Sequence, residues 1–244
     1  MSQPVDVLAF GAHPDDVELT VGGTMLLARA QGLRTAVVHF TLGEMGTRGT
    51  PETRREEATA AAAVLQADHL DFLGLRDGHL QVDDESKEAV IRALRRFRPR
   101  VVLAPYFEDL HPDHEAAGNI IRKAAFLSGL EKWDTGQEPW RPDSVLYYMS
   151  HHQFDPHLIV DVSPYFAAKR EAAACYVSQL HNPESTERQT YIAGSSFWDW
   201  WEGRARHWGH QIGVEYGEPY HLPGPLPSRN PFELFSGFGK YKNS

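Results

Sequence analysis

The 244-residue sequence contains one cysteine, no long apolar run and fewer basic than acidic residues. Cys175 cannot form an internal disulfide, and its alanine-rich surroundings are typical of a packed helix. No uncharged apolar run approaches the roughly 18 residues of a membrane span, and the N-terminus lacks the basic region of a signal peptide. We therefore expect a cytoplasmic protein with no membrane partner.

The charge balance is acidic. Lys and Arg total 24 against 33 Asp and Glu, a formal net charge of -9, which repels a phosphate backbone, so nucleic acid is not an expected partner. Hydrophobic residues at 41% and charged residues at 23% are ordinary globular values and exclude intrinsic disorder.

Short apolar runs rich in β-branched residues alternate with segments of helical periodicity, a pattern that predicts an α/β fold with a largely parallel sheet. The predicted strands cover residues 5–10, 35–41, 69–73, 101–105, 145–150 and 158–162. The predicted helices cover residues 16–31, 51–66, 84–97, 111–129, 165–180 and 197–208. Nothing marks a linker, so we expect one domain over residues 1–244. Gly, Pro and aromatic residues from about 209 to 244 predict an extended C-terminal tail.

The sequence His-Pro-Asp occurs twice, directly after the first and fourth predicted strands, at His13 and at His111. Each copy alone also fits an ordinary helix start, in which Asp caps the first turn and Pro follows. Capping does not need histidine, however. Because ligands of open parallel sheets bind beyond the carboxyl ends of the strands, the two clusters together predict a functional site.

A catalytic zinc site commonly takes three ligands from histidine and carboxylate and keeps one position for water. The predicted ligands are His13, Asp16 and His114. Asp15 is then free to act as general base toward the metal-bound water, and His111 is placed to stabilise the oxyanion or protonate the leaving group. We expect a hydrolase with one Zn²⁺ per chain, or with Fe²⁺ or another divalent metal in its place.

These residues suggest a family. Ala-His-Pro-Asp-Asp at 12–16 and His-Pro-Asp-His at 111–114 resemble the LmbE-like, or PIG-L, zinc-dependent N-deacetylases of N-acetylglucosaminyl compounds. Residues 43–50, Arg54, Glu57 and residues 145–149 are similar to the branch that deacetylates N-acetylglucosaminyl-L-malate in bacillithiol biosynthesis. The resemblance extends from about residue 8 to 220. It implies a Rossmann-like, mostly parallel sheet with helices on both faces and a C-terminal extension.

The resemblance implies the same metal ligands, base and acid as the residues themselves do. It further implies that Arg54 contacts the substrate, with Glu44, Arg48 and Tyr191 as additional substrate-binding candidates. One position departs from the bacillithiol branch, in which an arginine is expected directly before the second His-Pro-Asp-His. This sequence has Leu110 there, so a malate carboxylate would depend on Arg54, Arg48 or a residue of the tail.

Three other functions compete with deacetylation of an N-acetylated amino-sugar conjugate. A dinucleotide-binding oxidoreductase needs G-x-G-x-x-G in the first turn, where this chain has carboxylates. A non-haem iron oxygenase uses the same two-histidine, one-carboxylate set, but has no evident need for Asp15. A non-catalytic metal-binding module is the third alternative.

Two further features bear on the site and on assembly. Aromatic residues from Phe197 to Trp208 fall at helical spacing, which is typical of core packing or of a subunit contact, so we expect a homo-oligomer. His151 and His152 follow the fifth predicted strand, and one of them can point toward the substrate.

Overall fold

The computed structural model describes residues 3–181 and 186–226. Among those residues, no helix has both the length and the apolar character that crossing a membrane requires.

Seven strands form one sheet in the order β3-β2-β1-β4-β5-β7-β6. The strands are β1 (Val7–Gly11), β2 (Thr35–His39), β3 (His69–Phe72), β4 (Val101–Pro105), β5 (Ser144–Tyr148), β6 (Leu158–Asp161) and β7 (Gly217–His221). The first five are parallel, and β7 runs antiparallel to both of its neighbours. The predicted mostly parallel α/β sheet is therefore confirmed.

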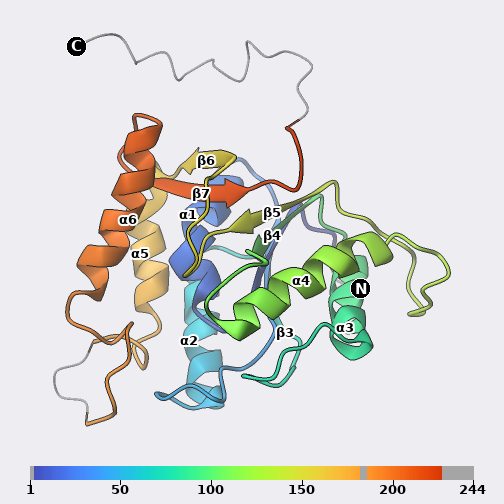
Figure 1. Cartoon of the computed structure of the whole chain (residues 1–244), viewed down its shortest axis with the longest axis horizontal. Helices are drawn as coiled ribbons and strands as arrows, with labels where there is room; N and C mark the ends of the chain where they lie inside the picture. Colours follow the sequence, from blue (N-terminus) through green and yellow to red (C-terminus); the bar gives the residue numbers. More distant parts are fainter. Residues whose placement is uncertain (1–2, 182–185, 227–244) are drawn as a thin grey trace.

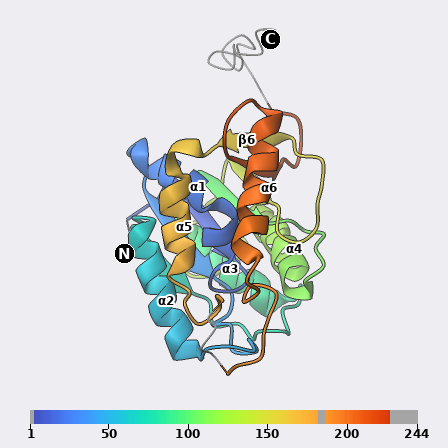
Figure 2. The same ribbon diagram turned by 90° about the vertical axis from the view of Figure 1, so that its left-hand side faces the viewer.

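Helices cover both faces of this sheet (Figure 1). They are α1 (Asp16–Ala30), α2 (Pro51–Val64), α3 (Asp84–Phe97), α4 (Pro112–Leu127), α5 (Phe166–Ala174) and α6 (Phe197–Gln211), with a short 3-10 turn at Ser163–Tyr165. One core packs α3 and α4 against the sheet, and a second packs α1 and α5 against the other face. Figure 2 shows α2, α5 and α6 standing side by side with α1 on that second face.

The predicted helix at 165–180 is shorter in the structure, where α5 ends at Ala174. Beyond it, the Glu57 carboxylate accepts hydrogen bonds from the Ser178 N–H at 2.6 Å and the Ser178 hydroxyl at 2.8 Å. The Gln179 amide donates to the Arg48 carbonyl at 2.7 Å. These contacts with the chain around α2 hold the segment outside a helix, and local periodicity does not reveal them.

The prediction of an extended tail from about residue 209 is wrong in two places: α6 continues to Gln211, and Gly217–His221 forms β7 inside the sheet. Buried Glu218 fixes this strand. Its carboxylate pairs with Lys169 of α5 at 2.7 Å and accepts the N–H groups of Gly23 and Thr24 of α1 at 2.9 and 2.8 Å. The remainder of the predicted tail, 227–244, lies outside the described residues.

Candidate active site

The two His-Pro-Asp segments lie at the point where the strand order of the sheet reverses. β1 and β4 are parallel neighbours, whereas β2 lies on the opposite side of β1. The helices that follow β1 and β4 pack on opposite faces of the sheet. A crevice therefore opens beyond the carboxyl ends of these two strands. The strands that precede the two motifs are therefore neighbours in the sheet.

Asp15 occupies a strained position at the start of α1. Its φ is 103° and its ψ is -26°, a region that residues other than glycine rarely adopt, and its carboxylate caps no helix N–H. The carboxylate instead pairs with Arg54 Nη2 at 3.0 Å, and the same guanidinium donates to the Pro14 carbonyl. Burial raises the pKa of Asp15 to about 6, against the opposing effect of the Arg54 charge.

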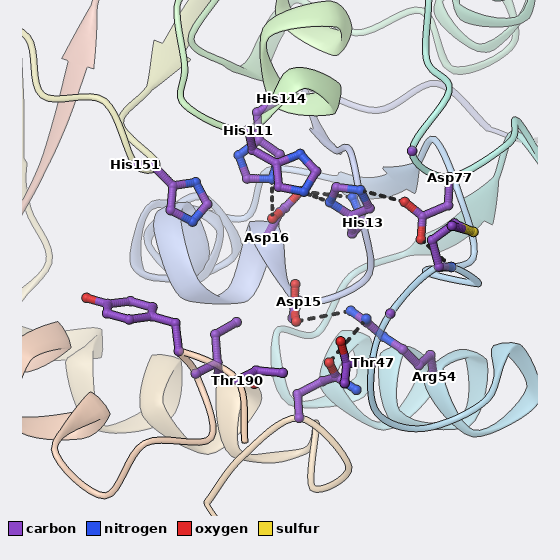
Figure 3. Close-up of a pocket in the computed structure, with 16 residues that line it drawn as sticks. His13, Asp15, Asp16, Thr47, Arg54, Asp77, His111, His114, His151 and Thr190 are labelled. Atoms are coloured by element: carbon purple, nitrogen blue, oxygen red, sulfur yellow. Dashed lines mark hydrogen bonds and ion pairs between the residues drawn. The ribbon is translucent and has the colours of Figure 1, made fainter. Parts of the chain in front are cut away.

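The three predicted metal ligands meet beside Asp15. Asp16 Oδ1 lies 3.2 Å from His114 Nε2, and Asp16 Oδ2 lies 3.7 Å from His13 Nδ1. The Asp16 carboxylate also accepts the His13 N–H at 2.9 Å, which closes the turn between β1 and α1. The two histidines and Asp16 thus converge from the ends of two neighbouring strands (Figure 3).

His111 lies against the same group. Its ring centroid is 4.8 Å from those of both His13 and His114, and a ligand atom from each of the three rings falls within a 4.8 Å cluster. His111 Nδ1 accepts the Asp113 N–H at 3.2 Å, so the proton of the neutral ring is on Nε2. Burial, together with the nearby histidines, lowers the pKa of His111 and favours this neutral form.

Sequence reasoning missed three carboxylates that hold these histidines. Asp77, from the loop after β3, lies 3.1 Å from His13 Nε2, and Asp113 lies 3.3 Å from the same atom. Asp113 also accepts the N–H groups of Gly78 and Leu80, so it joins the second motif to the loop after β3. Asp113 belongs to the second His-Pro-Asp-His motif, so the sequence did place it near the site. Asp77 belongs to no motif, and no sequence pattern indicated its role.

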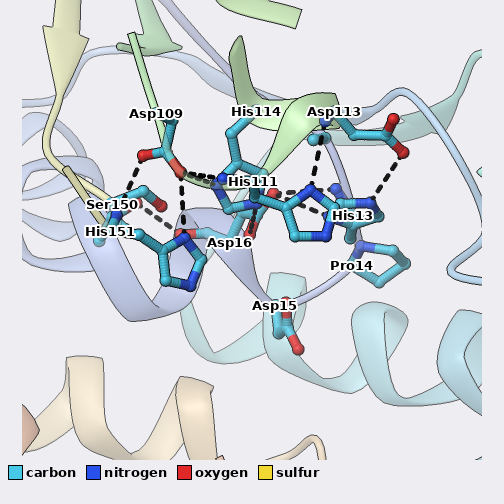
Figure 4. Close-up of polar contacts among 12 residues, drawn as sticks. His13, Pro14, Asp15, Asp16, Asp109, His111, Asp113, His114, Ser150 and His151 are labelled. Atoms are coloured by element: carbon cyan, nitrogen blue, oxygen red, sulfur yellow. Dashed lines mark hydrogen bonds and ion pairs between the residues drawn. The ribbon is translucent and has the colours of Figure 1, made fainter. Parts of the chain in front are cut away.

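Asp109 is the third missed carboxylate, and its side chain is fully buried. It lies 3.6 Å from His114 Nδ1 and 3.2 Å from His151 Nδ1, and it accepts the N–H groups of His111 and His151 at 2.9 and 3.0 Å. Figure 4 shows it between His114 and His151. Although burial opposes ionisation, these donors hold the pKa of Asp109 well below its usual range.

The surroundings of His13 and His114 fit a bound cation. Each ring presents one nitrogen to Asp16 and the other to a further carboxylate, an arrangement typical of metal-ligating histidines. Burial lowers the pKa of both rings, but the carboxylates override it and raise the pKa of His13 to about 9 and of His114 to about 10. A site that stabilises positive charge so strongly suits a divalent metal, whose binding displaces those protons.

A pocket of about 350 Å³ opens over these groups. Histidines form one wall, and Asp15, Arg54, Thr47 and Thr190 lie opposite (Figure 3). A side pocket of about 70 Å³ shares Asp15 and Asp16 with it and extends beneath α6.

The predicted substrate-binding residues divide into two groups. Arg54 and Tyr191 line the main pocket, although the Arg54 guanidinium is bonded to Asp15. Glu44 and Arg48 do not line it. The Glu44 carboxylate accepts the N–H groups of Leu42 and Asp77, and buried Arg48 pairs with Glu187 at 3.4 Å.

His151 and the aromatic stripe of α6 also border the site. His151 lines both pockets, as expected for one of the two adjacent histidines. Phe197, Trp201 and Trp208 of the stripe are buried, whereas Trp200 is 45% exposed beside the side pocket. The stripe therefore serves mainly as core, and the predicted homo-oligomer stays a prediction.

Comparison with known proteins identifies the family. The family model described as GlcNAc-PI de-N-acetylase (PIG-L) matches residues 8–125, which include both His-Pro-Asp motifs. The chain is 27% identical to a diacetylchitobiose deacetylase of Thermococcus kodakarensis over 87% of this chain and 80% of that one. It is 26% identical to a probable N-acetyl-alpha-D-glucosaminyl L-malate deacetylase 2 of Bacillus anthracis, over 83% and 93%.

Not every relative is named as a deacetylase, since a 4-oxalmesaconate hydratase of Pseudomonas putida is 25% identical over 71% of this chain and 74% of that one. Among solved structures, the conserved protein TT1542 of Thermus thermophilus is 37% identical with a TM-score of 0.83, covering 92% of this chain and 97% of that one. The motifs, the fold and these similarities agree, and the chain belongs to the PIG-L, or LmbE-like, deacetylase family.

Proposed function

We propose that this protein is a zinc-dependent hydrolase that removes the acetyl group from an N-acetylglucosamine conjugate. The observation that carries the proposal is the placement of Asp15. Its carboxylate is buried and held by Arg54, on a strained backbone, beside the two histidines and the carboxylate that suit a metal. A general base needs this position to reach a water molecule at the metal.

His13, Asp16 and His114 would hold the metal, which when bound lowers the pKa of a water ligand and polarises the amide carbonyl. Asp15, with a pKa of about 6, is mostly ionised at neutral pH and accepts the proton of the attacking water. The neutral His111 ring has its proton on Nε2, from which it donates a hydrogen bond to the developing oxyanion, and the proton that Asp15 accepts from water passes to the leaving amine. Arg54 keeps the base in place.

Two classes of aglycone follow from the relatives and from the resemblance of residues 43–50. One is L-malate, as in the bacillithiol branch, and the other is a second sugar, as in the chitobiose deacetylase. Both conjugates share the N-acetylglucosamine unit, so the proposed chemistry is the same for each.

The test measures acetate release from free N-acetylglucosamine, its β-1,4-linked disaccharide and N-acetylglucosaminyl-malate, with zinc added and with chelator. We expect chelator-sensitive acetate release from at least one substrate. Asp15→Asn should keep the metal and lower kcat by about 10² to 10⁴, the usual contribution of a positioned acid or base. His111→Ala should lower kcat more than it raises KM.

Several results would contradict this function. Undiminished turnover in Asp15→Asn would remove the proposed base. Addition of water to 4-oxalmesaconate, without acetate release from any sugar, would place the protein with the hydratase. Dioxygen uptake in place of hydrolysis would favour the iron oxygenase.

A further inference from the structure

Substrate discrimination depends on the residues at the open end of the pocket. Residues next to the proposed metal site, such as Asp15, Asp16 and His114, are buried and would surround the scissile amide. Among the lining residues, Met45 is 63% exposed and Tyr191 is 62% exposed. The aglycone, which projects from the sugar toward solvent, therefore meets uncharged side chains at the pocket entrance.

Tyr191 is supported by Trp200 of α6. The two ring centroids lie 5.5 Å apart with an interplanar angle of 78°, an edge-to-face contact. Both rings line the side pocket, and both are large, exposed hydrophobic groups. This aromatic pair offers an apolar surface beside polar side chains of the main pocket, Thr47, Thr190 and Gln179. Such a combination suits a sugar ring, which has apolar faces and hydroxyl edges.

The charges at the site disfavour an anionic aglycone. Within the described residues, Arg54 and Arg204 are the arginines that line the two pockets, and no lysine lines either. Arg54 is bonded to Asp15 and to the Pro14 carbonyl. Arg204 donates to the carbonyls of Ser150, at 2.6 Å, and Met149.

Leu110 adds no charge next to the second motif. Its apolar side chain is 79% exposed immediately before His111. The lining also contains the carboxylates of Asp15, Asp16 and Asp77. A malate conjugate would bring its two carboxylates toward these groups, and among the described residues that line the two pockets no uncommitted arginine or lysine is present to pair with them.

We propose that Tyr191 and Trp200 form an aglycone subsite that binds an uncharged ring, so that the enzyme prefers N-acetylglucosamine linked to a second sugar over N-acetylglucosaminyl-malate. The substrate preference in this inference rests on the proposed deacetylation. Binding of a ring at the subsite does not depend on it.

The experiment compares kcat/KM for the β-1,4-linked N-acetylglucosamine disaccharide, the malate conjugate and free N-acetylglucosamine. The wild type should prefer the disaccharide to the malate conjugate by about 10-fold or more. Tyr191→Ala and Trp200→Ala should each reduce the preference for disaccharide over monosaccharide by about 3- to 10-fold, mainly through KM, as expected for loss of an aromatic contact. Trp200→Phe should retain most of the preference for disaccharide over monosaccharide. Phe126→Ala is the matched control, because it removes a ring that is 58% exposed but lines neither pocket. This variant should leave the preference for disaccharide over monosaccharide unchanged.

Two kinetic results would overturn the subsite. One is a wild-type preference for the malate conjugate, and the other is an equal loss on disaccharide and monosaccharide in the two alanine variants. If no conjugate releases acetate, the proposed function fails, and calorimetric titration of the wild type with the disaccharide decides the subsite separately. Binding that weakens in Trp200→Ala but not in Phe126→Ala supports it, and absence of binding refutes it.

Discussion

The contact between Arg54 and Asp15 yields a prediction that separates two roles for the arginine. The resemblance to the malate-specific branch implies that Arg54 binds the substrate, whereas the structure bonds it to the proposed base. Its Nη2 lies 3.0 Å from Asp15 Oδ2, and both side chains are buried. Arg54→Gln removes the charge, while Arg54→Lys retains it and serves as the control.

The expected effect follows from the electrostatics of Asp15. Arg54 lowers the pKa of Asp15 against the effect of burial, so its loss raises that pKa above about 6. A charge-assisted hydrogen bond contributes about 1.5 to 3 kcal/mol, which corresponds to about one to two pKa units. The ionised fraction of Asp15 at pH 7 would then fall from about 90% to between about 50% and 10%. Turnover at pH 7 should fall by about 2- to 10-fold, with recovery as the pH rises.

The assay is the pH profile of kcat for acetate release between pH 5 and pH 9. In Arg54→Gln the acidic limb should move to higher pH by about one to two units, and the same shift should appear with free N-acetylglucosamine as with its conjugates. The test compares the position of the acidic limb in the variant with its position in the wild type, because a bound cation lowers the pKa of Asp15 in both proteins. An unmoved limb, with a rise in KM only for the malate conjugate, would refute this reasoning and assign Arg54 to the substrate carboxylate.

Three further predictions concern the metal and the fold. Alanine in place of a predicted ligand should remove most of the bound zinc, as measured by elemental analysis, and full occupancy would disprove the ligand set His13, Asp16 and His114. Asp109→Asn should weaken zinc binding by about 10- to 100-fold in competition with a chelator, since the carboxylate orients His114; unchanged affinity would make Asp109 merely structural. Glu218→Gln leaves Lys169 buried without its counter-ion and should cost about 3 to 5 kcal/mol of unfolding free energy, seen as a drop in Tm of about 6 to 20 °C. Asp143→Asn breaks an exposed pair with Arg100 and should cost under about 1 kcal/mol; equal shifts would contradict the reasoning.

The half of the site that comes from β1 and β4 could be predicted from the sequence. Parallel strands place their carboxyl ends at one edge, so residues that follow two strands are brought together by topology alone. His13, Asp16 and His114 follow this rule, and each histidine has a ring nitrogen within 3.7 Å of the Asp16 carboxylate. Which loop folds over that edge is not encoded in strand order, so Asp77 gave no signal.

The last strand was missed because its composition is typical of a turn. Gly217 and Pro219 disfavour a central strand, since proline cannot donate a ladder hydrogen bond. The structure accommodates Pro219 because β5 pairs only with Tyr220 and His221, so Pro219 lies beyond the end of that ladder. The decisive contacts join Glu218 to Lys169 and to α1, far away in sequence, where local patterns carry no information.

The late position of β7 in the chain has a consequence for biosynthesis. Within the described part of the sheet, β6 pairs with β7 alone, so a nascent chain that ends before Gly217 leaves both β5 and β6 with open edges. His151, which lines both pockets, follows β5, the strand whose edge β7 covers. Insertion of residues 217–221 therefore covers the exposed edge of β5 and joins β6 to the sheet, so that β3 and β6 remain as its edge strands.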